Sequence, residues 1–436
     1  MKSSKRKICQ AITLVISALG ASVAMAQTPP SLLGGGSSLV APTIGSEISV
    51  FPAADGTATY YSVGSGAGQS AFLNNQPSFF GSTVTGTVDF ANSDAPLSTS
   101  QISAYTSTGG LGVTNGPLIQ LPYIVTPITI PLVNAPTGTG PALPGSTTPT
   151  VALNDDDLCG IFSGKLTDWN QVTNPVNGSL YSTTSKPITV VYRADKSGTS
   201  DLLTAHLAQV CHTTPFVRNG VTVSANSNIT FTESQNFGGE FTTVPSTFKS
   251  ATGSSGVAAS LLALSGAGVG YLSPDYTNTF LAPSSAPAKA NNLSVASLHN
   301  DFSGANVTPT YANATAAIGT VYPPGTTQNQ NDPTDPSQWV PNASNPTVGY
   351  PISGTSQIIV SQCYQNHNNN PTVANSVIDF LNLHYTSNAS ILHGNGFDSV
   401  PSSFITAIQA DFLGNSSGLG LDIGDTSVCT GTTVGR

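Results

Sequence analysis

Three short polar segments hold the residues best suited to chemistry in this chain of 436 residues. They are GGGSS at 34–38, SVGSGAG at 62–68 and RADKSGT at 193–199. Each combines small residues and free backbone N–H groups with a hydroxyl near a predicted helix N-terminus. Binding a small tetrahedral oxyanion requires this combination, because many short donors must converge without bulk. A single segment is weak support, since turns use the same residues. Three segments and one arginine together predict an oxyanion site.

The elements around these segments predict an α/β fold. Residues 57–63 (TATYYSV) and 188–193 (ITVVYR) are rich in β-branched and aromatic side chains, as strands are, and a polar segment follows each. Apolar residues recur at helical spacing after Pro42, and again from Leu203 to Val210. Strands that alternate with helices favour sheets covered by helices.

The length favours two lobes rather than one core. The apolar segment 118–133 is interrupted by three prolines, so we expect it to cross between the lobes in extended form rather than to form one long central strand. Residues 277–346 are rich in Pro, Asn, Ser and Thr, which predicts a surface insertion that is partly ordered at most.

The N-terminus resembles a cleaved signal peptide. Basic residues at positions 2–7 precede an apolar stretch at 8–23, and Ala24-Met25-Ala26 is a small-x-small cleavage site. A membrane anchor is the alternative, but the apolar stretch is short and contains polar residues. We therefore expect cleavage after Ala26 and an exported protein, periplasmic or secreted, without a membrane anchor.

The charge balance excludes polyanionic partners. Only 8% of the residues are charged. Four of the 12 Lys and Arg residues lie in 1–26, which leaves 8 basic against 21 acidic residues and a net charge of −13. Nucleic-acid binders need a basic patch to replace counterions on the phosphates. We therefore expect no nucleic-acid partner.

Four cysteines remain after residue 26: Cys159, Cys211, Cys363 and Cys429. An even number in an exported protein indicates disulfides, and three pairings are possible. We favour Cys159–Cys211 and Cys363–Cys429, because each closes a loop of moderate length within one region. A zinc site is the alternative, but the chain has no C-x-x-C and no nearby His pair.

Several collinear motifs resemble the PstS-type phosphate-binding proteins of the periplasmic substrate-binding superfamily. They are GGGSSLVAP (34–42), YSVGSGAG (61–68), VDFANSDAPLS (88–98), IFSGKLTDWNQV (161–172), ITVVYRADKSGTS (188–200), GVAAS (256–260) and GVGYLSPDY (268–276). Residues 277–436 are more similar to an exported branch that includes small secreted alkaline phosphatases, through the QWVP…NPTVGY…QCY pattern at 338–364.

The resemblance implies a two-lobed periplasmic-binding-protein-like fold of type II, with a ligand cleft between the lobes. Residues 27–120 and 270–436 would form lobe I, with the insertion at 277–346, and residues 121–269 would form lobe II. The hinge would lie near 118–126 and 268–276.

The resemblance also implies a set of phosphate ligands. Ser38 stands where the family has a Thr, Leu39 would offer its backbone N–H, and Asp94 matches the buried carboxylate of SDAPL. Lys196 departs from the Gly common before SGT and would add a positive charge near the mouth of the site. The complete implied set is Ser38, Leu39, Ser65, Asp94, Arg193, Ser197, Gly198 and Thr199.

Asp94 is the informative member of this set. A carboxylate beside an oxyanion is favourable only if a proton lies between them, and phosphate carries a proton at neutral pH whereas sulfate does not. Asp94 would therefore select phosphate by leaving sulfate with an unpaired oxygen. The alternative for the isolated residues is structural: Asp94 caps a turn before Pro96, and Arg193 pairs with Asp195.

These observations favour a binding protein for inorganic phosphate that needs no cofactor or metal. It would either deliver phosphate to an ABC transporter in the membrane or sequester it outside the cell. The alternative is a secreted phosphomonoesterase using the same pocket, with Ser38, Ser65 or Thr199 as nucleophile. Hydrolysis needs an activated nucleophile or a metal-bound water, and none of the six His residues stands at metal-ligand spacing. We expect structural roles for His206 and His384. A third candidate is an extracellular structural or adhesive protein that has kept the fold.

Overall fold

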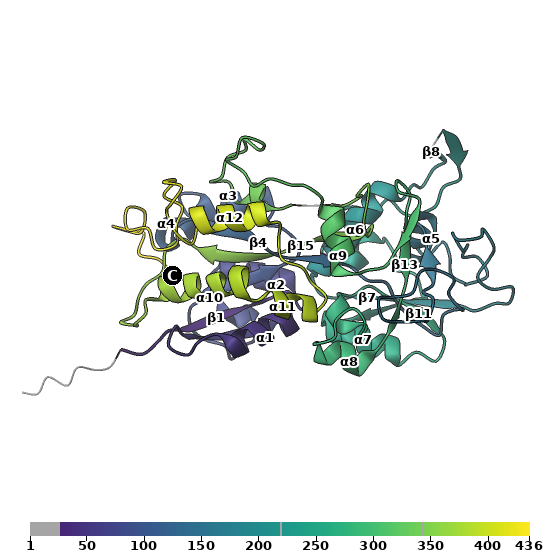
Figure 1. The fold of residues 1–436 in the computed structure, drawn as a ribbon, viewed down its shortest axis with the longest axis horizontal. Coiled ribbons are helices and arrows are strands. Elements are labelled where there is room, and N and C mark those ends of the chain that lie inside the picture. Colours follow the sequence, from purple (N-terminus) through teal and green to yellow (C-terminus); the bar gives the residue numbers. More distant parts are fainter. Residues whose placement is uncertain (1–26, 219, 342) are drawn as a thin grey trace, which may run out of the picture.

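The computed structural model describes residues 27–218, 220–341 and 343–436, so the predicted signal peptide and its cleavage site lie outside the described residues. Two α/β lobes lie end to end, each built on a five-stranded sheet (Figure 1). This confirms the expected two-lobed α/β architecture. Across these three ranges, no helix combines the length and hydrophobicity that crossing a membrane would require.

The first lobe contains a sheet with strand order β2-β1-β3-β15-β4. β1 pairs in parallel with β2 and β3, whereas β15 runs antiparallel to β3 and β4. The strands are β1 (Ser31–Gly36), β2 (Thr57–Ser62), β3 (Phe90–Ser93), β4 (Leu118–Pro127) and β15 (Ser353–Ser361). The helices are α1 (Ala41–Val50), α2 (Ser65–Leu73), α3 (Thr99–Thr106), α4 (Gly112–Asn115), α10 (Val373–Ser387), α11 (Ala389–Gly394) and α12 (Ser402–Asp411).

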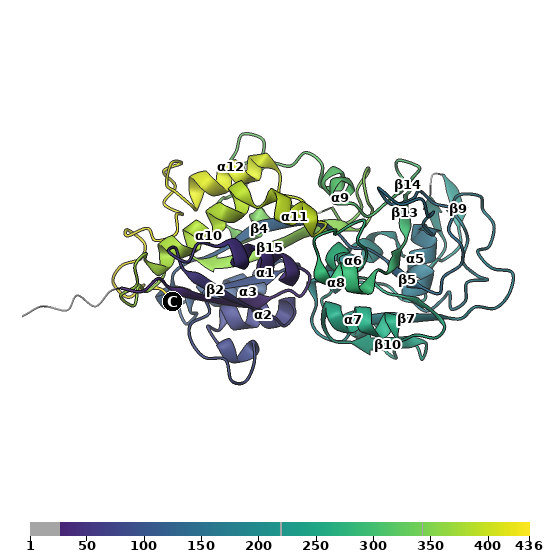
Figure 2. The same ribbon diagram turned by 60° about the horizontal axis from the view of Figure 1, so that its bottom comes forward.

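The second lobe contains a sheet with strand order β10-β7-β11-β5-β12. β7 pairs in parallel with β10 and β11, and β5 is antiparallel to β11 and β12. The strands are β5 (Pro131–Val133), β7 (Ile188–Arg193), β10 (Phe248–Ala251), β11 (Ala267–Val269) and β12 (Ser294–Val295). The helices are α5 (Asp155–Phe162), α6 (Gly198–Val210), α7 (Gly253–Leu262) and α8 (Ala286–Asn291). A hairpin of β8 (Phe216–Arg218) and β9 (Val221–Val223) projects from the end of this lobe (Figures 1 and 2).

The proline-rich segment 118–133 runs from the first sheet into the second, as its composition predicted. β4 lies at the edge of its sheet, where Pro122 is tolerated next to a register shift opposite Ser356 and Gln357. Further along, the Ile128 N–H donates to the Ile352 carbonyl (2.8 Å) and the Thr129 N–H donates to the Leu272 carbonyl (2.8 Å). Three chain segments therefore lie side by side between the sheets.

Residues 277–346 are more ordered than their composition suggests. They contain α8, β12, β13 (Ser297–Asn300), β14 (Ala305–Val307) and α9 (Tyr311–Ile318). The resemblance places this segment in lobe I, yet β12 pairs with β5, and β13 pairs with β6 (Ala152–Leu153). Backbone pairing and a few buried side chains, such as Leu298, hold these strands in place, and composition alone does not reveal them.

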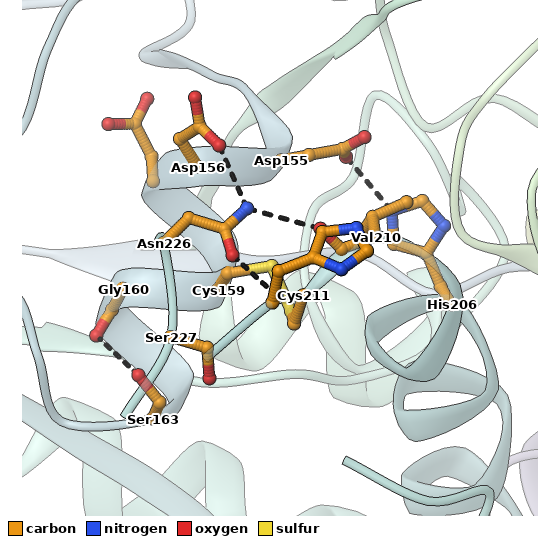
Figure 3. Close-up of a disulfide and its surroundings, with 12 residues drawn as sticks. Asp155, Asp156, Cys159, Gly160, Ser163, His206, Val210, Cys211, Asn226 and Ser227 are labelled. Carbon is orange, nitrogen blue, oxygen red and sulfur yellow. Dashed lines mark hydrogen bonds and ion pairs between the residues drawn. A yellow bond between two sulfur atoms is a disulfide. The ribbon is translucent and has the colours of Figure 1, made fainter. Parts of the chain in front are cut away.

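Two disulfides, Cys159–Cys211 and Cys363–Cys429, confirm the favoured pairing, each with a Cα–Cα distance of 5.4 Å. The first ties α5 to the residue that ends α6. Figure 3 shows Asn226 beside it, where its amide donates to Asp156 Oδ1 (2.8 Å) and to the Val210 carbonyl (3.1 Å). This disulfide and its polar neighbours stabilise the helix pair of the second lobe.

Candidate functional site

Four helices begin just after parallel strands end, and their N-termini come from both lobes. α1 follows β1 and α2 follows β2 in the first lobe, whereas α6 follows β7 and α7 follows β10 in the second. The carboxyl ends of parallel strands are the usual place for ligands in α/β sheets, and helix N-termini favour anions. The predicted polar segments lie at three of these N-termini.

Contacts between the lobes bring these N-termini together. Ser38, just before α1, makes a 2.8 Å hydroxyl–hydroxyl contact with Ser254 in α7, and the Ser254 N–H donates to Ser38 Oγ (3.2 Å). At the start of α6, a Cβ placed on Gly198 would lie 2.5 Å from Asp94 Cβ and 2.6 Å from Ser65 Oγ. Glycine at this position therefore allows α6 to approach the first lobe.

The two predicted donors from the first lobe are buried and preceded by glycines with unusual backbone angles. Gly36 (φ +137°) and Gly64 (φ +93°) turn the chain after β1 and β2, in a region that other residues rarely adopt. Ser65 then begins α2, and its Oγ accepts the Asp94 N–H (3.2 Å). Leu39 is fully buried, as expected for a residue that offers only its backbone.

Asp94 has one carboxylate oxygen satisfied and the other free. The side chain is only 1% exposed, and its Oδ1 accepts the Ser356 hydroxyl (2.8 Å). Its Oδ2 is buried and has no partner in the described chain. Burial raises the pKa of this carboxyl, while the nearby hydroxyls of Ser37, Ser356 and Ser65 and the charge of Arg193 act in the opposite direction. A buried carboxylate oxygen without a donor is costly, which indicates a place for a ligand proton.

Arg193 ends β7 and is 2% exposed, which is rare for an arginine. Its Nε donates to Asp195 Oδ1 (2.8 Å), and its Nη2 also pairs with Asp195. Asp195 Oδ1 also accepts the Gly253 N–H (2.9 Å) at the start of α7. Hydrogen bonding to Arg193 and its charge hold the pKa of Asp195 below its usual range, against the effect of burial. The pairing with Asp195 is the structural alternative that the sequence offered, and it also orients the guanidinium beside α7.

The N-terminus of α6 supplies three of the predicted residues. Ser197 is the N-cap, with its Oγ accepting the Ser200 N–H (3.3 Å), and Gly198 and Thr199 form the first turn. The Thr199 hydroxyl is buried and has no partner in the described chain. Asp94 and Thr199 therefore each present an unsatisfied buried oxygen in the same region of the molecule.

Sequence reasoning missed three serines of this region: Ser37, Ser254 and Ser356. Ser254 belongs to a GSSG stretch at the start of α7, which is a fourth small-residue segment of the same kind as the three predicted ones. Ser37 lies within one of those three segments, next to the predicted ligand Ser38. Ser356 lies inside the apolar strand β15, so no local pattern marks it.

The two histidines expected to be structural are buried and each contacts a carboxylate. His206 Nε2 contacts Asp155 Oδ1 (3.0 Å), and His384 Nδ1 contacts Glu47 Oε1 (2.7 Å). Within residues 27–218, 220–341 and 343–436 no three His, Cys, Asp or Glu side chains are grouped to hold a metal ion. The hydroxyls, the helix N-termini and the oriented arginine described above can bind and orient an anion.

Comparison with known proteins gives the family. The family model of the PBP superfamily domain matches residues 22–383. This chain belongs to the PBP superfamily. The relatives of this PBP superfamily member confirm the resemblance that its motifs indicated.

Two relatives and one solved structure illustrate that similarity. Alkaline phosphatase L of Pseudomonas aeruginosa is 35% identical over 430 residues, which cover 98% of each chain. A phosphate-binding protein from an unknown prokaryotic organism is 33% identical over 390 residues, or 86% of this chain and 93% of the relative. The high-affinity periplasmic phosphate-binding protein PfluDING, solved with bound phosphate, has a TM-score of 0.70 at 31% identity and covers 93% of this chain and 99% of that chain.

Proposed function

We propose that this chain is an exported binding protein for inorganic phosphate, captured between the two lobes. Two observations of different kinds support this proposal: relatives named as phosphate-binding proteins cover most of the chain, and the serine-rich helix N-termini meet around one arginine and one aspartate. The proposed ligands are those that the resemblance implied: Ser38, Leu39, Ser65, Asp94, Arg193, Ser197, Gly198 and Thr199.

The observation that carries the proposal is the unpartnered Oδ2 of Asp94. The groups proposed to donate hydrogen bonds to a tetrahedral oxyanion lie around this oxygen. An ionised carboxylate would nevertheless repel a fully ionised anion bound among them. A proton between Asp94 and the ligand resolves the conflict, and inorganic phosphate supplies one at neutral pH. Arg193, already oriented by Asp195, would give a charge-assisted contact that stays fixed during binding.

The charge of the chain sets how capture would occur. With 8 basic and 21 acidic residues after position 26, the protein repels phosphate at long range. Attraction would therefore come from hydroxyls, helix N-termini and one arginine at short range. We further propose that the lobes close about the segments 118–126 and 268–276, that residues 1–26 are removed after Ala26, and that an ABC transporter receives the phosphate.

Calorimetry with phosphate and sulfate tests this function. The purified protein should bind phosphate at least about a hundredfold more tightly than sulfate, the difference expected when a buried carboxylate faces an unpaired oxyanion oxygen. Arg193→Ala should weaken phosphate binding by roughly 30-fold or more, because a buried charged partner is lost. The proposal would be wrong if the wild-type protein bound neither anion.

The second candidate function is a phosphomonoesterase that uses the same pocket. The similarity to Alkaline phosphatase L over nearly the whole chain favours it. The burial of the site argues against this function, because Ser65 and Thr199 are each 1% exposed. The alcohol group of a phosphate ester would have to stay outside the closed site, or the lobes would have to open to admit it. Turnover of a chromogenic phosphate ester that disappears in Arg193→Ala would favour the enzyme, and no turnover would favour the binding protein.

A further inference from the structure

The two lobes touch at a rim just outside the proposed phosphate site. The N–H of Gly66, in the first turn of α2, donates to the Lys196 carbonyl (3.1 Å) in the segment before α6. A Cβ placed on Gly66 would lie 2.5 Å from Lys196 Cβ and 3.1 Å from Gln235 Oε1. Because Lys196 Cβ is bonded to the backbone, it cannot move aside like the end of a flexible side chain. A hydrogen atom is the largest group that this contact admits.

A glutamine on the same face of α2 forms a second contact across the rim. Gln69 is 2% exposed, and its amide nitrogen donates to Ser93 Oγ and to the Ala95 carbonyl, both at 2.9 Å, on either side of Asp94. Its Oε1 accepts from Gln101 (3.1 Å) within the lobe and from Gln235 (3.2 Å) in the other lobe. Gln69 therefore links the Asp94 loop to the second lobe.

The second-lobe side of the rim is fixed to α6. The Ser197 N–H donates to the Gln235 carbonyl (3.0 Å), and the Ser234 N–H donates to Thr204 Oγ1 (2.8 Å). The segment that touches Gly66 and Gln69 therefore moves with the helix that begins at the proposed phosphate ligands. A groove of about 730 Å³ runs along this rim, lined by Gly66, Gln69, Lys196 and Gln235 among others.

We propose that Gly66 is a positioning residue that sets how far the two lobes close on phosphate. The three atoms nearest to a Cβ at this position all belong to Lys196 and Gln235 of the second lobe, and Gly66 is not among the glycines with positive φ. Alanine is the better helix former. The close approach of the two lobes therefore explains why glycine occupies this helical position. This inference rests on the proposed phosphate binding.

Gly66→Ala tests the proposal because stability and binding should change in opposite directions. Phosphate affinity should fall by roughly tenfold or more, since overpacking at a rigid contact prevents full closure. The melting temperature without phosphate should stay the same or rise, since Ala stabilises a helix. Stopped-flow measurements should show faster phosphate dissociation, because a less closed cleft releases the ion more readily.

Two glycines provide matched controls. Gly45 lies inside α1, and a Cβ placed there would have nothing within 4 Å, so Gly45→Ala should leave phosphate affinity unchanged. Gly68 lies in α2 like Gly66, but its Cβ would meet Gly36 Cα at 2.5 Å within the first lobe. Gly68→Ala should therefore lower the melting temperature, which distinguishes a clash within a lobe from a clash between lobes.

A rescue experiment completes the test. Lys196→Gly removes the Cβ that the new methyl group of Gly66→Ala would strike. The double variant should therefore bind phosphate almost as tightly as the Lys196→Gly single variant. That comparison also removes the effect of the lysine charge. Wild-type affinity in Gly66→Ala, or the absence of rescue, would overturn this inference alone. A wild-type protein that bound no phosphate would overturn the proposed function and this inference together.

Discussion

Two buried carboxylates of the first lobe, Glu47 and Asp94, differ in how completely they are partnered. Glu47 is fully buried in α1, and its Oε1 accepts from His384 Nδ1 (2.7 Å) and from Asn388 (3.0 Å). Its Oε2 accepts the Tyr123 hydroxyl. Asp94 is buried to a similar degree, but its Oδ2 has no partner in the described chain.

The difference distinguishes a structural group from a proposed binding group. Both ring nitrogens of His384 are engaged, Nδ1 by Glu47 and Nε2 by the Tyr123 carbonyl (2.7 Å). That cluster ties α1, β4 and α10 together and leaves nothing for a ligand. Asp94 Oδ2 has no donor in the described chain, which supports the binding role proposed for it. Burial alone does not distinguish the two carboxylates.

Removing Glu47 should have the largest effect on stability. Glu47→Ala leaves His384 and Tyr123 buried without their partner, which should cost about 3–5 kcal/mol of the free energy of unfolding. Urea denaturation without phosphate measures this cost. A loss below about 1 kcal/mol would show that the cluster is not the structural counterpart of Asp94.

His206 provides an intermediate case in the second lobe. Its ring contacts Asp155 Oδ1 (3.0 Å) and the Ser344 carbonyl (2.8 Å), and although burial opposes it, the Asp155 charge raises its pKa above 6.5. A raised folded-state pKa stabilises the protein fully below the unfolded pKa, and this stabilisation is lost as pH rises through the folded value. The difference in the free energy of unfolding between wild type and His206→Gln should therefore be larger below pH 6.5 than at alkaline pH. A difference independent of pH, measured by urea denaturation across this range, would contradict the ion pair.

Asp94→Asn should have the smallest effect on stability, and of opposite sign to Glu47→Ala. The folded-state pKa of Asp94 is raised by burial, so the ionised side chain opposes folding above its unfolded pKa of 3.8. Asn removes that charge and should leave stability without phosphate unchanged or higher by about 1 kcal/mol. The gain should vanish as the wild-type carboxyl becomes protonated at acidic pH. A clear loss of stability at neutral pH would place Asp94 with Glu47 as a structural group.

Local patterns predicted the strands and helix starts that carry the continuous segments of the candidate site. The strand at 188–193 and the helix start at Ser197 agree with β7 and α6, because β-branched residues and a capping hydroxyl act within a few residues. Ser356 and the strands β12 and β13 were missed, since their places depend on pairing with distant segments. For the same reason, the sequence did not reveal the contact between Glu47 and His384, which are 337 residues apart. Asp94 entered the candidate site only through the resemblance to a family, because its own surroundings in the sequence also suit a turn cap.

The ratio of sulfate to phosphate affinity in wild type and Asp94→Asn tests the central claim most directly. Calorimetry at neutral pH should show strong preference for phosphate in the wild type, because the free Oδ2 of Asp94 accepts a proton that sulfate does not have. In Asp94→Asn an amide N–H can replace that oxygen and donate to sulfate, so the preference should fall by roughly tenfold or more. An unchanged ratio in the folded variant would contradict the account of Asp94 as the proton acceptor.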